Sequence, residues 1–399
     1  MALNLIRNAR MFFTTNVDAA TGVVATTGFD ATNTREIQVL DGLSFSQATG
    51  SETVTVNEAG TAPVRGQRQF NTSLDPVEIT FSTYMRPYFN AGASGTTDDQ
   101  IDCEEDVLWN AFATGAGNTD AWAVTTGATP VSTLTMAQSA KNQLKTFGII
   151  VILDQTSYII DNCALDQATI DFGLDAISTI AWTARGTVMR NIGDSAVLAA
   201  DKPTAFSTDI TFSGTYFTAG TNEAKNKNTG AAFLANKLSS VALSSIAVGG
   251  VYGGGASTTY NLALTGGSIT LANNITYLTP ANLGVVNKPV TYFTGTRAVS
   301  GTLNCYLKTG STNSAGLLDA MLDDNTNVEP AFALTVHVGG GSATKPRVSL
   351  TMPSVVLQIP TINTEQVVST TINFTAQGLT SSAFDLEAKN EISIAYYAQ

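Results

Sequence analysis

The chain has 399 residues, of which 43% are hydrophobic and 13% are charged, and its formal net charge is −12. The length and hydrophobic content predict two or three domains with buried cores, and no stretch approaches the ~20 apolar residues of a membrane helix. The acidic balance argues against a protein that grips nucleic acid through Lys and Arg. So few charged residues are typical of an all-β protein with many turns, or of one whose surface is covered by copies of itself.

The acidic surplus is uneven along the chain. Residues 1–200 hold 21 acidic and 10 basic residues, a balance of −11, and the remaining residues hold 11 and 10, a balance of −1. Such a surplus suits either ordinary solubility or a surface that repels a polyanion.

The first residues carry no signal for export. Residues 1–10 lack the apolar run of a signal peptide, so we expect no secretion by that route. The three cysteines, Cys103, Cys163 and Cys305, lack the spacing of metal ligands and are predicted to be reduced core thiols of a protein made in a cytoplasm.

Residues 1–200 are predicted to form a first β-rich domain. Ile79 and Phe81 alternate with polar residues, which is the period of a half-buried strand. The predicted elements, in chain order, are a turn and strand at 40–48, a strand at 77–86, a short helix at 107–112, a hairpin from 147–153 and 158–160, and a strand at 180–186. Stretches rich in Gly and Thr at about 90–105 and 115–135 are predicted to be loop insertions.

A linker at 201–236 is predicted to lead into a second domain at 237–399. Its elements come in the same order as those of the first: a turn and strand at 264–272, a strand at 299–308, a helix at 317–322, a hairpin from 332–338 and 348–352, and a strand at 372–378. The two halves therefore resemble two copies of one unit. The matched core and helix positions are Leu108, Phe112 and Trp182 in the first copy, and Leu318, Leu322 and Phe374 in the second.

Little in the chain suggests catalysis. His337 is the single histidine and lies in an apolar strand, so we expect a structural, hydrogen-bonded side chain rather than a triad or metal site. The acidic cluster at 98–106 lacks the spacing of a calcium loop and is predicted to be a solvated loop before a helix. We therefore predict no enzymatic activity, no cofactor and no metal. A carboxylate pair of a glycan hydrolase is a weak alternative, because only Trp109 and Trp122 lie near the acidic loop.

A second acidic series runs along β-like sequence, at Asp154, Asp161, Asp166, Asp171 and Asp175. It is better explained as the charged face of a strand, partly lining a polar passage, than as a hydrolytic site.

The order of strands, the two short helices, the closing Ala184-Arg185-Gly186 and Ala376-Gln377-Gly378, and the opening residues 6–16 resemble the major tail tube proteins of tailed phages. The resemblance implies β-sandwich domains with a flanking helix, six of which close into a ring. The inner sheets join into a β-barrel, and rings stack into a conduit for DNA ejection. Two tube-like domains per chain resemble the tube proteins of some long-tailed siphophages and imply a trimeric ring with pseudo-sixfold symmetry.

The resemblance also implies partners and a location. The subunit would assemble with itself in the host cytoplasm and belong to the virion tail. It would meet the tape measure, the tail terminator, the baseplate or tip and, in a contractile tail, a sheath, without contacting a membrane. The acidic candidates for the lumen are Asp161, Asp166 and Asp171, and lysine at these positions should slow DNA ejection. The alternatives are a β-sandwich adhesin or decoration protein of a virion or cell surface, and a type VI secretion tube protein.

Overall fold

The computed structural model describes residues 9–25, 33–54, 68–91, 99–115, 121–127, 130–136, 143–153, 156–194, 231–245, 258–323, 331–342, 344–364, 367–378 and 391–398. Within these ranges the protein is mainly β, as the sequence predicts. The predicted linker at 201–236 lies largely outside the described residues.

Within the described ranges, the first half contributes fourteen strands and one helix. The strands are β1 (Ala9–Thr14), β2 (Thr34–Ile37), β3 (Ser44–Ser46), β4 (Thr49–Val54), β5 (Arg68–Leu74), β6 (Val77–Tyr84), β7 (Pro87–Asn90), β8 (Gln100–Cys103), β9 (Trp122–Thr125), β10 (Val131–Thr135), β11 (Phe147–Leu153), β12 (Thr156–Asp171), β13 (Thr179–Gly186) and β14 (Val188–Asp194). The helix is α1 (Asp106–Ala113).

The second half follows a 3-10 turn, η3 (Asn236–Leu238). Its strands are β15 (Ser240–Ser245), β16 (Thr259–Tyr260), β17 (Ala263–Ala272), β18 (Thr276–Leu278), β19 (Thr291–Phe293), β20 (Ala298–Tyr306), β21 (Ala331–Gly339), β22 (Arg347–Leu357), β23 (Thr361–Asn363), β24 (Ser369–Gln377) and β25 (Ser393–Tyr397). Its helix is α4 (Ser314–Asp323), so both predicted helices are confirmed.

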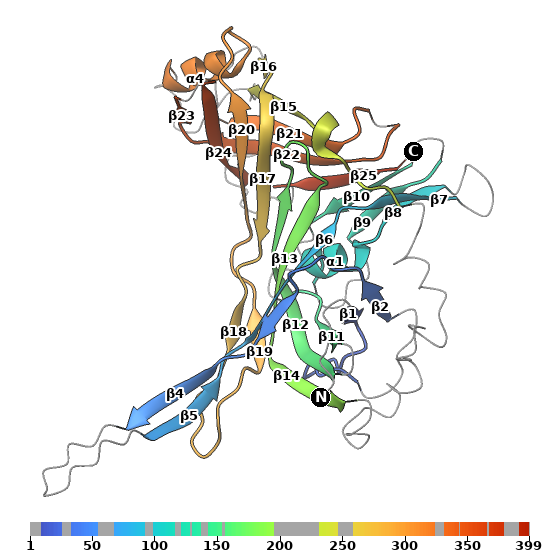
Figure 1. Ribbon diagram of the computed structural model, residues 1–399, viewed down its shortest axis with the longest axis vertical. Helices are drawn as coiled ribbons and strands as arrows, with labels where there is room; N and C mark the ends of the chain where they lie inside the picture. Colours follow the sequence, from blue (N-terminus) through green and yellow to red (C-terminus); the bar gives the residue numbers. More distant parts are fainter. Residues whose placement is uncertain are drawn as a thin grey trace, which may run out of the picture.

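One continuous antiparallel sheet crosses both halves (Figure 1). Its strand order is β3-β6-β13-β12 from the first half and β17-β20-β24-β23 from the second. We call these eight strands the shared sheet. The two halves meet where β12 pairs with β17.

The remaining long strands form further ladders in each half. In the first half, β2-β1-β11 continues through the first part of β12 to β14. In the second half, β16-β15-β21-β22 continues to β25. Strand β25 also pairs with β10, so a strand near the end of the chain is hydrogen-bonded to the first half.

The shared sheet buries one face, because apolar and polar residues alternate along its strands. On β6 the buried residues include Ile79 and Phe81, and on β13 they include Ile180 and Trp182. Helix α1 covers this face through Trp109, whose ring lies 4.8 Å from that of Trp182. The three cysteines are free and buried, as predicted.

Two sequence predictions about loops need correction. The insertion at about 90–105 contains strand β8, which pairs with β7, and the insertion at about 115–135 contains β9 and β10, which pair with each other. Gly and Thr content suggested loops, but β10 is held by pairing with the distant β25, which local composition does not reveal.

Candidate assembly surface

The seam between the two halves is a ladder of five residue pairs, from Gln167 opposite Ala272 to Asp171 opposite Ser268. Buried Asn273 adds hydrogen bonds across it, because its amide donates to the carbonyl oxygens of Phe112 (3.2 Å) and Leu165 (3.1 Å). Tyr277 donates its hydroxyl to the carbonyl oxygens of Asn162 and Arg185. The seam is therefore both a backbone ladder and a buried polar contact.

The two outer strands of the shared sheet each have one unpaired side. Among the described residues, β3 pairs with β6 alone and β23 pairs with β24 alone. All three residues of β23 are exposed. An exposed strand edge is a template for pairing with another chain unless something covers it.

The solvent-facing side of the shared sheet is dominated by hydroxyl and amide side chains. We call it the hydroxyl face. The register of the ladders places on it Ser44, Ser46, Glu78, Thr80, Ser82, Tyr84, Gln167, Thr169, Asp171, Thr179, Ala181, Thr183, Arg185, Ser268, Thr270, Ala272, Ala298, Ser300, Thr302, Asn304, Tyr306, Thr361, Asn363, Ser369, Thr371, Asn373, Thr375 and Gln377. A hollow of about 440 Å³ crosses this face near the seam and is lined by Asp171, Thr302 and Asn304, among others.

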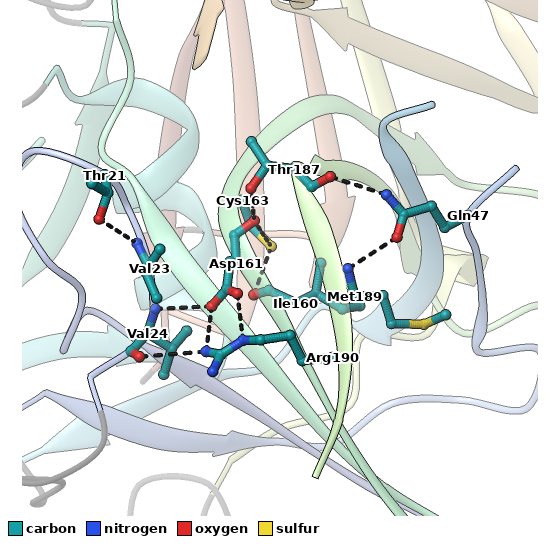
Figure 2. Close-up of polar contacts among 10 residues, drawn as sticks. All are labelled: Thr21, Val23, Val24, Gln47, Ile160, Asp161, Cys163, Thr187, Met189 and Arg190. Carbon is teal, nitrogen blue, oxygen red and sulfur yellow. Dashed lines mark hydrogen bonds and ion pairs between the residues drawn. The ribbon is translucent and has the colours of Figure 1, made fainter. Parts of the chain in front are cut away.

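Asp161, a predicted lumen residue, is buried in the first part of β12 (Figure 2). Its carboxylate accepts two hydrogen bonds from the Arg190 guanidinium, at 2.6 and 2.7 Å, and one from the backbone N–H of Val24, at 2.9 Å. Its side chain is 4% exposed. The charge of Asp161 is thus used to hold β14 and the turn before Val24 against β12.

Asp166 lies at the bulge where β12 passes from one ladder to the next. It accepts a hydrogen bond from the N–H of Ile275 at 2.8 Å and lies 3.5 Å from the Arg185 guanidinium. Asp171, at the end of β12, is exposed and lies on the hydroxyl face. Asp154, from the same acidic series, lies outside the described residues.

The matched core and helix positions are mostly internal. Leu108, Phe112, Trp182 and Phe374 are each at most 2% exposed. Leu318 is half-buried in α4, and Leu322 lies near the end of that helix.

The acidic cluster before α1 is not the solvated loop that the sequence predicts. Both carboxylate oxygens of Asp106 accept hydrogen bonds from Nη1 of Arg35, and Glu105 is 1% exposed. Glu105 accepts a hydrogen bond from the Tyr396 hydroxyl at 2.7 Å, and that hydroxyl accepts one from the Trp109 indole at 2.8 Å. Burial raises the pKa of Glu105 from its ordinary value of 4.5 to about 7. Since Tyr396 belongs to β25, this network ties the end of the chain to α1.

His337 has the structural role predicted for it. Its Nδ1 lies 2.8 Å from the Ser349 hydroxyl on the neighbouring strand, and burial lowers its pKa. Within the described ranges, three or more metal-ligating side chains do not gather anywhere, and neither helix is long and apolar enough to cross a membrane.

Two hairpins project from the shared sheet, β4–β5 from the first half and β18–β19 from the second (Figure 1). Exposed apolar side chains gather on the second hairpin and its connection, at Leu278, Leu283, Val285, Val286, Val290 and Phe293. The hairpins touch through a parallel bridge between Ser73 and Asn287. None of the predicted elements includes this surface, although the run Leu283-Gly284-Val285-Val286 between turn residues could have indicated it.

No protein-family model matches the chain. It is 30% identical, over 381 residues, to the tail tube protein pb6 of Escherichia phage T5. The match covers 94% of this chain and 73% of that protein.

Proposed function

Because the chain belongs to the tail tube proteins of bacteriophages and is a structural protein of the virion tail, we propose how it builds the tube. Three copies close a ring of six similar domains, rings stack along the tail, and the lumen is the conduit for DNA. Each domain is one copy of a duplicated unit.

The pairing of strands supports the duplication. The ladder β3-β6-β13-β12 of the first half has the same connections as β17-β20-β24-β23 of the second, with α1 and α4 at equivalent places in the chain. A bulge between Phe147 and Ile149 in β11 matches one between Phe332 and Leu334 in β21. Equivalent bulges are conserved features of a fold rather than accidents of sequence.

The observation that carries the ring is the seam between β12 and β17. In the duplicated frame, β23 is the counterpart of the end of β12, and β3 is the counterpart of β17. The pair Thr169–Thr270 at the seam then corresponds to Thr361 of one chain opposite Ser46 of the next. The same contact, repeated head to tail, closes a ring when a whole number of the rotations between neighbouring domains completes one full turn. Closure also covers both open edges.

We assign contacts between rings to the β4–β5 and β18–β19 hairpins. They leave the sheet on the same side, as Figure 1 shows. Leu283 is fully exposed, and Val285 and Val286 are 63% and 52% exposed. Apolar side chains gathered on a projection are typical of a surface that another subunit covers. The occupant is the body of the next ring.

A cysteine cross-link tests the ring. We expect Ser46→Cys combined with Thr361→Cys to join chains covalently under mild oxidation, because directly opposed residues bring their Cβ atoms within about 5 Å. Gel electrophoresis should show a product of three chains and no larger closed species. Thr169→Cys with Thr270→Cys is the matched control, since those hydroxyls are 3.1 Å apart within one chain.

Three outcomes decide the proposal. Cross-linked trimers support it, whereas hexamers would give a ring of six chains. Intrachain bonding in the control without any interchain bonding in assembled tubes would show that β3 and β23 do not meet.

The remaining partners follow from the place of a tube in a tail. We propose contacts with the tape measure, the tail terminator, the baseplate or tip and, in a contractile tail, a sheath. The role is structural and needs no catalytic residue.

A further inference from the structure

The hydroxyl face carries very little charge for a chain with a formal net charge of −12. On the described strands its charged residues are Glu78, Asp171 and Arg185. Glu78 and Arg185 are directly opposite each other on β6 and β13, and Arg185 also lies near Asp166. Most acidic residues of the first half therefore lie off this face, among them Asp161, whose side chain is buried against Arg190.

Several hydroxyls of this face, at and beside the seam, are hydrogen-bonded across the strands. Thr169 and Thr270 are 3.1 Å apart at the seam, and Ser268 and Thr302 are 3.2 Å apart on the next pair of strands. Thr371 donates to the side-chain oxygen of Asn304 at 3.0 Å. Groups satisfied in this way have less capacity to bind a passing phosphate.

We propose that the hydroxyl face is the DNA-facing wall of the conduit, and that it lets DNA slide because it is nearly neutral rather than because it is acidic. This inference rests on the proposed function. A wall rich in Lys or Arg would hold the phosphates by releasing their counterions. A strongly acidic wall would instead recruit cations into the lumen. A nearly neutral wall of hydroxyl and amide side chains, several of them hydrogen-bonded to one another, does neither, which also fits the small share of charged residues in the chain.

The location of the face can be tested by thiol labelling. The three native cysteines are buried, so an introduced cysteine reports its own position. Thr302→Cys lies on the hydroxyl face. Ala20→Cys lies outside that face, in an exposed turn that is attached to β12 by the hydrogen bond from the N–H of Asn162 to the carbonyl oxygen of Gly22. In assembled tubes we expect a small maleimide to label both variants, and a maleimide on a large protein carrier to label Ala20→Cys alone. After dissociation the carrier should reach both.

The outcomes separate this inference from the proposed function. If the carrier labels Thr302→Cys in intact tubes, the hydroxyl face is not the DNA-facing wall. The proposal that the protein assembles into tubes is unaffected by this result. If electron microscopy shows that the unmodified protein forms no tubes, the proposed function is contradicted, and the inference that rests on it is contradicted too.

The role of neutrality is tested with Thr302→Lys against Ala20→Lys, which adds the same charge outside the hydroxyl face. We expect virions with Thr302→Lys to release DNA at least about threefold more slowly at ~50 mM than at ~200 mM salt, because screening weakens the new phosphate contacts. Virions with Ala20→Lys should match the unmodified phage. Equal behaviour of the two lysine variants would overturn the neutral-wall proposal, and the labelling result stands even if Thr302→Lys blocks assembly.

Discussion

The two parts of strand β12 use acidic residues in opposite ways. In its first part, from Thr156 to Cys163, Asp161 is buried and bonded to Arg190 and Val24. In its second part, from Ala164 to Asp171, the strand joins the seam and ends with an exposed Asp171 on the hydroxyl face. Asp166 lies at the bulge near the start of the second part, just before the residues that pair with β17.

The difference teaches that acidic residues along one strand need not share a face or a task. A bulge inserts one extra residue, so the side chains beyond it change their relation to the sheet. The strand also changes partners there, from β11 and β14 to β13 and β17. Net charge alone therefore says little about which surface is acidic.

The largest expected effect comes from breaking the buried contact. Asp161→Asn removes the buried charge that pairs with Arg190. Its amide oxygen can keep the bonds from Val24 and one Arg190 N–H, but its NH₂ then faces the Arg190 Nε–H donor, which should lower the free energy of unfolding by about 3 kcal/mol. Asp175→Asn is the matched control, because Asp175 pairs with Lys237 at the surface, where both side chains are well exposed, and should cost less than about 1 kcal/mol. Chemical unfolding measures both. Equal losses of unfolding free energy in the two variants would show that the buried Asp161 stabilises the fold no more than the exposed Asp175 does.

Glu105 allows the same contrast to be measured by pH. Its folded-state pKa of about 7 lies above its ordinary value of 4.5, so the folded chain keeps a proton that the unfolded chain has released. The free energy of unfolding contributed by this group is therefore full below pH ~4.5 and is lost as the pH rises through about 7, a change of about 3 kcal/mol.

Glu105→Gln should remove this component, so the difference in stability between variant and unmodified protein should change between pH 4.5 and 7.5. Glu52→Gln, at an exposed position in β4, is the control and should leave the pH dependence as it is. A parallel pH dependence in Glu105→Gln and the unmodified protein would show that Glu105 is not held in its protonated form.

An intermediate effect is expected at the bulge. Asp166→Asn can still accept the hydrogen bond from Ile275 but loses the ionic contact with Arg185, whose side chain is 34% exposed. We expect a loss of about 1 kcal/mol in unfolding free energy. A loss as large as that of Asp161→Asn would show that Asp166 stabilises the fold as much as the buried Asp161 does. The change in the role of acidic residues along β12 would then come after Asp166.

Much of the fold could be predicted from the sequence, because the signals are local. Period-two alternation located β6, and two nearly continuous apolar runs around a short polar turn located the hairpin of β11 and β12. A one-sided apolar pattern located α1 and α4. Even the match of Trp182 with Phe374 is only two residues from the one that the ladders give. Val77 and Val299 begin equivalent strands, so Phe81 corresponds to Leu303, whose partner on β24 is Ile372. A slip of two residues keeps the side chain on the same face, so sequence alone could not detect it.

The candidate surface was harder to predict, because it depends on contacts between distant segments. No local signal says that Arg190 reaches Asp161, 29 residues away, or that Tyr396 reaches Glu105, 291 residues away. Both contacts bury an acid that composition would place in solvent. Nor does the sequence of β3 or β23 indicate that no other described strand pairs with its outer side, since that depends on the order of strands in the whole sheet.

The smallest expected effect belongs to the exposed end of β12. Asp171→Asn should change the free energy of unfolding by less than about 0.5 kcal/mol, because the side chain is exposed and makes few interactions that the substitution could remove. Tubes of this variant should form normally, and DNA ejection should be unchanged within error, since a single carboxylate contributes little to a wall made of hydroxyls. Asp171→Lys keeps the original expectation for an acidic lumen residue, which is slower ejection with normal assembly. If Asp171→Asn slows ejection as much as Asp171→Lys, the carboxylate of Asp171 itself repels DNA. The hydroxyl face would then depend on acidic charge, and the exposed acid at the end of β12 would have a function in ejection.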